Sequence, residues 1–213
     1  MRVLSKKKIL NAAIFLAVFV LWTVALRYVD VQEIGPQGSR VGLATLNGWF
    51  HSFTGVHLSL YTITDWLGLV PFFTALAFAI LGLVQWIGRK SLFRVDRSLF
   101  VLGGFYILVI AAYLFFEAVP LNFRPVLIEG RLEASYPSST TLLSLCVMPT
   151  AWIELRSRIK NDALKRIVFV AIAVFTAFMV VARLISGVHW LTDIIGGALL
   201  SAALVALYVA FAG

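Results

Sequence analysis

Residues 167–213 read IVFVAIAVFTAFMVVARLISGVHWLTDIIGGALLSAALVALYVAFAG. Two uncharged apolar runs, 167–182 and 194–213, flank a short segment that carries an arginine, a histidine and an aspartate. Each run is close to the roughly 20 apolar residues that a helix needs to cross a bilayer core about 30 Å thick. The stretch therefore predicts two transmembrane helices joined by a short polar connection.

The same pattern recurs along the whole chain of 213 residues. Hydrophobic residues make up 61% of the sequence and charged residues only 13%, and the mean hydropathy is +0.96. This composition excludes an ordinary water-soluble globule, whose helices need a polar face. We expect an all-α fold, an integral membrane bundle of six transmembrane helices in one domain covering 1–213. The predicted spans are about 9–27, 66–88, 98–117, 137–155, 167–185 and 190–212.

Basic residues are distributed unevenly among the predicted connections. Thirteen of the eighteen Lys and Arg lie on one side of the predicted bundle, namely Arg2, Lys6, Lys7, Lys8, Arg89, Lys90, Arg94, Arg97, Arg156, Arg158, Lys160, Lys165 and Arg166. Because short loops rich in Lys and Arg stay in the cytoplasm, this side and both termini are predicted to be cytoplasmic. The net charge of +8 is then a topology signal, and nucleic acid is not expected as a partner.

The opposite, extracytoplasmic side gathers most of the groups that could carry chemistry. Seven of the ten acidic residues, all three His and the remaining five Arg fall there. A segment of about 41–57 has apolar residues at three- and four-residue steps, which predicts a short helix lying in the membrane interface. His51 and His57 are expected to be surface histidines near it. The lone Cys146 allows no intrachain disulfide.

A histidine and an aspartate stand four residues apart before the last predicted span. On a helix, His189 and Asp193 would share a face and could hydrogen-bond. An acceptor on one imidazole nitrogen fixes the tautomer and leaves the other nitrogen free as a nucleophile. Arg183 ends an otherwise uncharged span, where an ionisable group is costly and therefore marks a functional position.

A second polar stretch opens the fourth predicted span. Pro137 suits the first position of a helix, so the backbone N–H groups of the three residues after it would point out of the helix N-terminus and form an anion site. Arginines before this stretch and at the end of the fifth span could add forked hydrogen bonds. The predicted phosphate-binding residues are Arg124, Arg183, Ser138, Ser139 and Thr140.

Together these stretches resemble the type 2 phosphatidic acid phosphatase (PAP2) family of six-helix membrane lipid phosphatases, which are related to vanadium haloperoxidases. The family motifs are K-x6-R-P, P-S-G-H and S-R-x5-H-x3-D. The sequence keeps Arg124-Pro125, Pro137-Ser138, and Arg183 with His189 and Asp193 at the family spacing. The resemblance implies a bundle with a PAP2/vanadium-haloperoxidase-like core.

The resemblance also implies a division of roles among the site residues. His189 would be the nucleophile that takes the phosphoryl group, and Asp193 would orient it. Arg124, Arg183 and the backbone at 138–140 would hold the phosphate oxygens. No metal and no organic cofactor are implied.

Two motif positions depart from the family pattern. Glu117 stands where the family has a phosphate-binding Lys, and Thr140 stands where it has the general-acid His; Ala182 replaces the Ser of the third motif. A threonine hydroxyl cannot donate a proton near neutral pH, although general acid catalysis contributes about 10²- to 10⁴-fold in rate. The loss matters less when the leaving group is a phosphate, whose second pKa is about 6. We therefore expect lipid pyrophosphates to be favoured over monoesters.

Other acids could compensate for these departures. Glu133, Glu129 or the substrate itself could supply the missing proton. Glu117 could form an ion pair with Arg131 or Arg124, which is the favoured interpretation, or it could bind a divalent cation together with Glu129 or Glu133.

The predicted function is an extracytoplasmic lipid phosphate or pyrophosphate phosphatase that acts through a phosphohistidine intermediate. Its substrate would be a membrane lipid, a polyprenyl pyrophosphate or a phosphatidate-like lipid, and it would be a multi-pass protein of the cell membrane. Two alternatives remain open. One is a phosphotransferase that uses the same His189, and the other is a non-catalytic lipid-phosphate binding protein, which the two replaced motif residues would explain.

Overall fold

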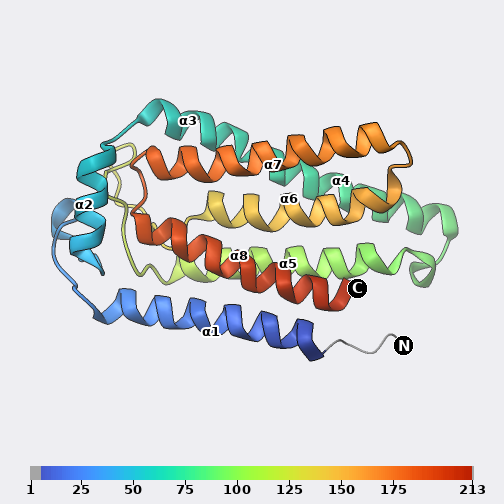
Figure 1. The fold of residues 1–213 in the computed structure, drawn as a ribbon, viewed down its shortest axis with the longest axis horizontal. Helices are drawn as coiled ribbons and strands as arrows, with labels where there is room; N and C mark the ends of the chain where they lie inside the picture. Colours follow the sequence, from blue (N-terminus) through green and yellow to red (C-terminus); the bar gives the residue numbers. More distant parts are fainter. Residues whose placement is uncertain (1–5, 213) are drawn as a thin grey trace.

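The computed structural model describes residues 6–212 and is an all-α membrane bundle (Figure 1). Six long helices run along its long axis: α1 (Lys6–Tyr28), α4 (Leu69–Arg89), α5 (Arg97–Ala118), α6 (Ser139–Arg158), α7 (Asp162–Ile185) and α8 (Leu191–Ala212). Two shorter helices are α2 (Ala44–Thr54), which caps one end of the bundle, and α3 (Leu58–Leu67). We call the capped end the α2 end. Single turns of 3-10 helix lie at Pro36–Gly38 and Leu92–Arg94.

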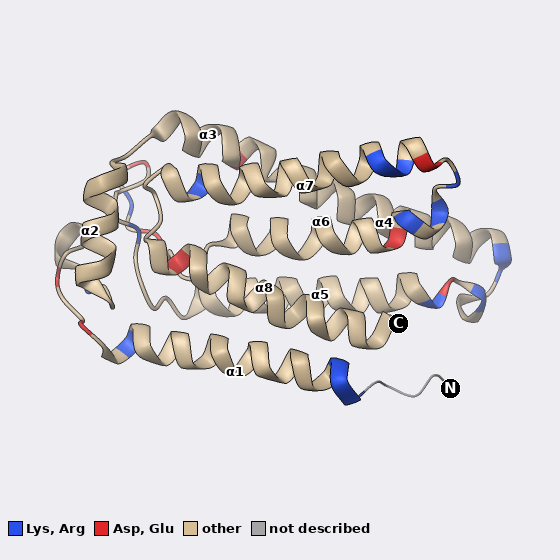
Figure 2. Cartoon of the chain, in the orientation of Figure 1, with Lys and Arg blue, Asp and Glu red and all other residues tan. Residues whose placement is uncertain are grey.

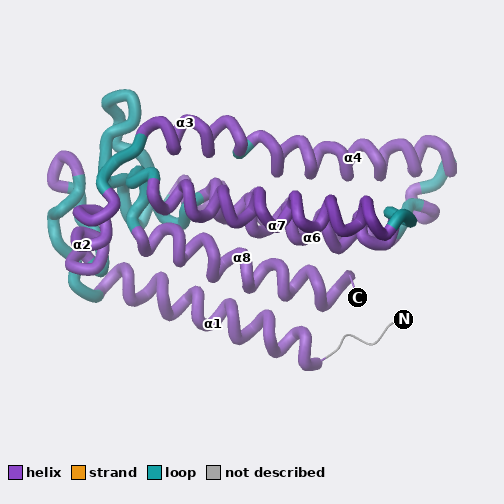
Figure 3. The backbone as a smooth tube through the Cα atoms, turned by 45° about the horizontal axis from the view of Figure 1, so that its top comes forward, coloured by secondary structure: helices purple, strands orange, loops and turns teal. Residues whose placement is uncertain are grey.

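Five stretches are long and apolar enough to cross a membrane: Lys6–Tyr28, Leu58–Arg89, Arg97–Ala118, Asp162–Ile185 and Leu191–Ala212. In the second of them α3 continues into α4 with only Gly68 between (Figure 3). The more polar α6 is not among the five, yet ten of its twenty residues are buried, and it packs against α4, α5, α7 and α8. A helix enclosed by other helices can carry polar side chains that lipid does not tolerate.

Lys and Arg gather at the end of the bundle opposite α2, around the α4–α5 and α6–α7 connections (Figure 2). We call this the basic end. Of the thirteen basic residues that the sequence assigned to one side, Arg2 lies outside the described residues. The other twelve stand at or near the ends of helices that meet there.

A polar network crosses the basic end. Glu154, only 4% exposed, accepts a hydrogen bond of 2.8 Å from Tyr208 Oη and pairs with Arg158 Nη2 at 3.0 Å. Arg158 Nη1 also lies 3.2 Å from Asp96 Oδ2. Gln85 Nε2 donates to the same carboxylate at 2.8 Å, and this bond is the largest cause that lowers the pKa of Asp96 to about 2. The network joins four helices at this end.

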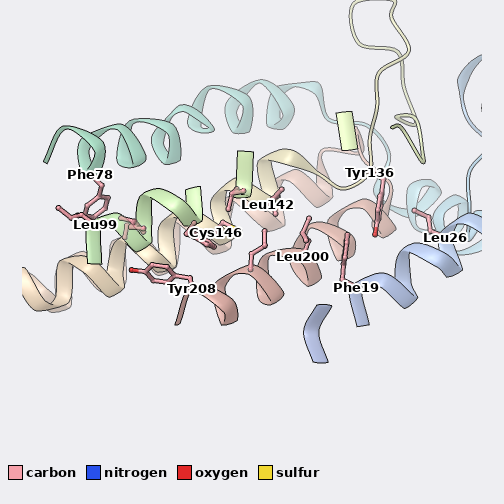
Figure 4. Packing of buried hydrophobic residues seen from close by; sticks show 14 residues of the cluster. Phe19, Leu26, Phe78, Leu99, Tyr136, Leu142, Cys146, Leu200 and Tyr208 are labelled. Atoms are coloured by element: carbon pink, nitrogen blue, oxygen red, sulfur yellow. The ribbon is translucent and has the colours of Figure 1, made fainter. Parts of the chain in front are cut away.

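The loop that leads into α6 packs against the apolar core through Tyr136 (Figure 4). Tyr136, 1% exposed, stacks parallel to Phe19 with ring centroids 6.4 Å apart and meets Phe116 edge-on at 5.9 Å. Its hydroxyl lies 2.6 Å from Thr23 Oγ1. A Cβ atom on Gly196 would clash with the tyrosine ring, so glycine at this position lets α8 approach the loop closely.

The predicted interfacial segment contains α2, and α3 follows it as a second helix that was not predicted, since most of it precedes the predicted span at 66–88. Trp49 and Phe53 on α2 are exposed and stack on each other with ring centroids 6.4 Å apart. On the opposite side, buried Asn47 donates to Thr192 Oγ1 at 2.9 Å and accepts from Thr192 N at 3.2 Å. These two bonds fix α2 to the first turn of α8.

Candidate active site

A cavity of about 470 Å³ opens at the α2 end, where α3, α5, α6 and α7 meet the loop between α5 and α6. Five of the seven predicted site residues line it, namely Arg124, Ser139, Thr140, Arg183 and His189. The other two, Ser138 and Asp193, are fully buried and do not line it. Residues from three separate sequence motifs therefore meet around one cavity.

The predicted direct contact between His189 and Asp193 is replaced by a bridged one. His189 lies in the loop before α8 rather than on a helix, because α8 begins at Leu191. Its Nδ1 is 3.7 Å from Asp193 Oδ2, beyond hydrogen-bond distance. Ser135 fills the gap, since its Oγ lies 3.0 Å from His189 Nδ1 and donates to Asp193 Oδ2. The aspartate reaches the histidine through a serine hydroxyl.

Asp193 is enclosed by neutral hydrogen-bond donors. Besides the Ser135 hydroxyl, its Oδ2 accepts from the backbone N–H of Trp190 at 2.8 Å. Its Oδ1 accepts from Asn122 Nδ2 at 3.4 Å. A buried carboxylate is costly without hydrogen bonds, and these three donors supply them.

The proton on His189 can be assigned from its neighbours. Arg124 Nη1 lies 3.4 Å from His189 Nε2, and a guanidinium can only donate. Nε2 therefore carries the lone pair, and Nδ1 carries the proton that faces Ser135. Burial, followed by the positive charges of Arg124 and Arg183, lowers the pKa of His189 well below its usual value. The imidazole is neutral at pH 7, with an unprotonated nitrogen beside Arg124.

Arg183 is a buried cation with little compensation. Its side chain is 1% exposed, and its ion-pair partner Asp65 Oδ1 is 3.9 Å from Nη2. Nη1 donates to Thr64 Oγ1 at 3.1 Å, and the guanidinium carbon stands 4.7 Å from the centre of the Tyr61 ring. Nε makes no hydrogen bond within residues 6–212. A buried cation that is paired so weakly favours binding of an anion.

Arg124 contacts the same aromatic ring. Its guanidinium carbon lies 5.8 Å from the centre of the Tyr61 ring. Its Nε is 3.0 Å from Glu133 Oε2, an ion pair that is not aligned as a hydrogen bond. Tyr61 thus stands beside both guanidinium groups at one cavity, and two planar, multiply donating groups suit the oxygens of a phosphate.

The start of α6 differs from the expected anion site. Pro137 precedes the helix instead of opening it, because Ser138 is the N-cap and its Oγ accepts a hydrogen bond from Thr141 N at 3.4 Å. The Ser138 N–H donates to the backbone oxygen of Asp193 at 3.1 Å. Ser138 is therefore occupied by the protein itself. Ser139 and Thr140 line the cavity, and the first N–H groups of a helix have no partner within it.

The loop between α5 and α6 is shaped by a two-residue turn. Glu129 and Gly130 have positive φ values of 50° and 76°. Around them, Ile128 and Arg131 exchange backbone hydrogen bonds of 3.1 and 2.9 Å. This geometry is typical of a type I′ hairpin turn.

The same hairpin aligns two residues of the site. The backbone N–H of Arg124 donates to Glu133 O at 3.0 Å, and the N–H of Ser135 donates to Asn122 O at 2.9 Å. Arg124 and Ser135 are therefore held on one short ladder. Sequence reasoning missed Ser135, Asn122 and Tyr61. The Glu-Gly pair offers a weak turn signal, whereas nothing in the α3 sequence marks its tyrosine.

Glu117 lines the cavity but does not form the predicted ion pair. Arg124 pairs with Glu133 instead, and Glu117 has no basic partner within residues 6–212. The same part of the chain contains no group of three His, Cys, Asp or Glu that could hold a metal ion. Of the two glutamates that could share a divalent cation with Glu117, Glu133 lines the cavity and Glu129 does not.

The two other histidines lie outside the cavity lining. His57 is exposed, and its Nε2 is 2.9 Å from Thr54 O. His51 packs against the Trp190 ring with centroids 5.4 Å apart, and partial burial lowers its pKa. Only His189 combines burial, a fixed tautomer and access to the cavity.

Comparison with known proteins agrees with this architecture. The chain matches the PAP2 superfamily over residues 10–213. Its fold is similar to the crystal structure of the first transmembrane PAP2 type phosphatidylglycerolphosphate phosphatase from Bacillus subtilis, with a TM-score of 0.61 and 19% identity over 94% of this chain and 95% of that chain. No curated protein matches the chain significantly. Because the family match covers nearly all of the sequence, the chain belongs to the PAP2 superfamily of membrane phosphatases.

Proposed function

We propose that this protein removes phosphate from a lipid phosphate or pyrophosphate at the extracytoplasmic surface of the cell membrane, with His189 as the nucleophile. The observation that carries the proposal is the position of His189 Nε2. It holds a lone pair 3.4 Å from Arg124 Nη1, and the same cavity is lined by Arg183. A phosphate bound by the two guanidinium groups would lie next to this nitrogen.

The reaction would take place in two steps. The Nε2 lone pair forms a bond to phosphorus while the bond from phosphorus to the leaving oxygen breaks, and the leaving group takes up a proton. Water then adds to phosphorus, and the electron pair of the P–N bond returns to Nε2. One water proton stays on the released phosphate and the other replaces the proton that the leaving group consumed.

Several residues would share the binding of the transferred phosphoryl group. Arg124 and Arg183 would hold its oxygens with charge-assisted hydrogen bonds. The N–H groups of Ser139 and Thr140 would add the helix N-terminus of α6. The hydroxyl and backbone of Ser138 are engaged within the protein, so its contribution would be to shape the turn.

The leaving group decides how much the absence of a histidine at position 140 matters. Thr140 lines the cavity, but its hydroxyl cannot act as an acid. Among the glutamates proposed as substitutes, Glu133 lines the cavity and Glu129 does not. General acid catalysis is worth about 10²- to 10⁴-fold, and a phosphate leaving group needs it least. A lipid pyrophosphate is therefore the favoured substrate class, ahead of a phosphatidate-like monoester.

The orientation in the membrane is inferred from charge. The cavity lies at the α2 end, whereas Lys and Arg gather at the basic end (Figure 2). Because basic connections remain cytoplasmic, the cavity would face the extracytoplasmic side. With α6 crossing among the five apolar stretches, the chain would span the membrane six times and leave both termini in the cytoplasm.

One feature supports a second candidate function, a lipid-phosphate binding protein without turnover. Glu117 and Thr140 both line the cavity, at positions where the PAP2 motifs have a lysine and a histidine. The two candidates differ in outcome because only an enzyme releases phosphate. A phosphotransferase using His189 would instead give the phosphate to an acceptor other than water.

The experiment uses detergent-purified full chain with phosphatidate, phosphatidylglycerol phosphate and a polyprenyl pyrophosphate. We expect phosphate release from the pyrophosphate to be fastest, to be abolished in His189→Ala, and to persist in the control His57→Ala, which removes an exposed histidine outside the cavity. Acid-labile phosphate trapped on the wild-type protein should be absent from His189→Ala. A gain on monoesters in Thr140→His would show that the missing acid limits the reaction.

Three results would contradict the proposal. Binding of all three lipids without phosphate release would favour the binding protein. Transfer to an added alcohol with little free phosphate would favour the phosphotransferase. Full activity in His189→Ala would exclude this histidine as the nucleophile.

A further inference from the structure

We propose that Ser135 is a positioning residue that couples Asp193 to the nucleophilic His189, so that the aspartate acts through the serine hydroxyl. The inference rests on the proposed function, because it assigns a role relative to that nucleophile. It departs from the sequence expectation, in which Asp193 itself would orient the histidine.

His189 Nδ1 lies closer to the Ser135 hydroxyl than to the Asp193 carboxylate. His189 Nδ1 is 3.0 Å from Ser135 Oγ but 3.7 Å from Asp193 Oδ2. A donor–acceptor separation of about 3.6 Å or more is not a hydrogen bond, so the serine lies within range of the imidazole and the carboxylate does not. The Ser135 hydroxyl in turn donates to Asp193 Oδ2.

The donor and acceptor roles are fixed from both ends. Arg124 can only donate, which places the lone pair of His189 on Nε2 and the proton on Nδ1. Nδ1–H must then donate to Ser135 Oγ. That hydroxyl has one proton, and it is directed to Asp193. The Ser135 hydroxyl therefore accepts a hydrogen bond from His189 Nδ1–H and donates one to Asp193 Oδ2.

The backbone holds Ser135 independently of its hydroxyl. The residue is 3% exposed, and its N–H donates to Asn122 O at 2.9 Å. Asn122 also donates to Asp193 Oδ1 through its side chain at 3.4 Å. A Ser135→Ala variant keeps the ladder and removes only the relay, which makes the substitution a clean test.

The relay fits the charge that develops during the reaction. When Nε2 bonds to phosphorus, the imidazole becomes positive while its Nδ1 keeps the proton. The chain from Nδ1–H through the hydroxyl to the carboxylate stabilises this charge without moving any proton. Hydrogen bonds of this kind strengthen when one partner becomes charged, so the stabilisation is larger in the transition state than in the resting enzyme.

The test measures phosphate release by the full chain from a polyprenyl pyrophosphate, with Ser135→Ala, Ser135→Thr, Asp193→Asn and the double variant Ser135→Ala/Asp193→Asn. The matched control is Ser144→Ala, a buried serine in α6 whose hydroxyl has no hydrogen-bond partner among the described residues. Leaving a buried donor unpaired should lower kcat/KM in Ser135→Ala by about 10- to 100-fold. Ser135→Thr keeps an Oγ and should recover part of the loss.

The double variant and the pH profile separate positioning from a merely structural role. If Asp193 acts through Ser135, the double variant loses no more than the worse single variant, instead of the product of both losses. The acid limb of kcat/KM should move to lower pH in Ser135→Ala, because the bond from Nδ1–H to the hydroxyl strengthens when His189 becomes positive and is lost in the variant, while the backbone hydrogen bond of Ser135 to His189 remains. The charged groups around the ring, Arg124, Arg183 and Asp193, are unchanged in this variant.

Additive losses, or an unchanged acid limb together with unchanged kcat/KM in Ser135→Ala, would overturn the proposal. Neither result would affect the proposed function as long as His189→Ala stays inactive. Conversely, activity in His189→Ala would refute the proposed function whatever Ser135→Ala does. If Ser135→Thr folds poorly, the double-variant comparison alone decides the matter.

Discussion

Each end of the bundle buries one carboxylate, and the two are satisfied in different ways. At the basic end, Glu154 pairs with Arg158 at 3.0 Å and accepts from Tyr208 at 2.8 Å. At the α2 end, Asp193 is held by the neutral donors Ser135, Trp190 and Asn122. The charge of Glu154 is paired with the cation of Arg158. Asp193 has only neutral donors as hydrogen-bond partners, so its charge is not paired with an arginine or lysine.

The arginines differ in the same sense. Arg158 reaches two carboxylates, those of Glu154 and Asp96, at 3.0 and 3.2 Å. Arg183 is more deeply buried, yet its only ion-pair contact among the described residues is Asp65 at 3.9 Å. One end of the fold uses its charges to hold helices together, and the other leaves them incompletely paired beside a cavity. Four predictions test this difference.

The largest effect is expected from Arg183→Met. Loss of one donor to the phosphoryl group should lower kcat by about 10²- to 10³-fold. Thermal stability should stay the same or rise, because a poorly paired buried cation is replaced by an apolar side chain. Phosphate release and the melting temperature in detergent measure the two effects, with the exposed Arg40→Met as control. A large loss of stability would show that the buried cation holds the fold.

Replacing the arginine at the basic end should have the opposite effect, with lower stability and nearly unchanged activity. Arg158→Met leaves Glu154 buried without its cation, which should lower the free energy of unfolding by about 1–3 kcal/mol. Activity per folded molecule should remain within a few-fold of wild type, since the cavity is at the other end. Arg156→Met, an exposed neighbour on α6, is the control for stability. Loss of turnover without loss of stability would mean that the two ends are coupled.

The pH dependence of kcat/KM should reflect the suppressed basicity of His189. In the proposed reaction its neutral form is the nucleophile, and its pKa lies well below the usual 6.5. Protonation therefore requires more acid, so the plateau should continue below pH 6.5, and activity should fall about tenfold per pH unit only beyond the acid limb. A pH series with the polyprenyl pyrophosphate measures this. A limb at or above pH 6.5 would contradict a histidine buried beside two cations.

The smallest effect is expected at Tyr61, whose ring stands 4.7 Å from the Arg183 guanidinium carbon and 5.8 Å from that of Arg124. Tyr61→Leu removes both cation–π contacts, each worth about 0.5–2 kcal/mol, and should raise KM by about tenfold with little change in kcat. Tyr61→Phe keeps the ring and should behave as wild type. Equal losses in both variants would assign the effect to the hydroxyl rather than to the ring.

Much of this arrangement could be predicted from the sequence because it is local. Apolar runs of membrane length indicate an all-α membrane bundle, and the Arg183, His189 and Asp193 spacing indicates the family. Five of the seven predicted site residues also line the cavity. Helix α6 is too polar to count as a membrane span by hydropathy alone, because half of its residues are buried against other helices.

The contacts that refine the site could not be predicted, since they join residues far apart in the chain. Ser135 and His189 are 54 positions apart, and their contact depends on a hairpin whose Glu-Gly turn gives only a weak signal. The expected His189–Asp193 bond failed for a local reason. The helix begins two residues after the histidine, so helical spacing does not apply to it.

Tyr136, next to the site residue Ser135, packs against residues that are made early and residues that are made late during synthesis. Thr23 and Tyr136 touch although they are 113 positions apart, and α1 packs along α8. Synthesis releases α1 long before either partner exists. Until α8 is made, the loop that carries Ser135 lacks its contacts with Gly196 and Asp193. The arrangement around Ser135 is therefore complete only when α8, which carries Asp193 and packs along α1, is in place.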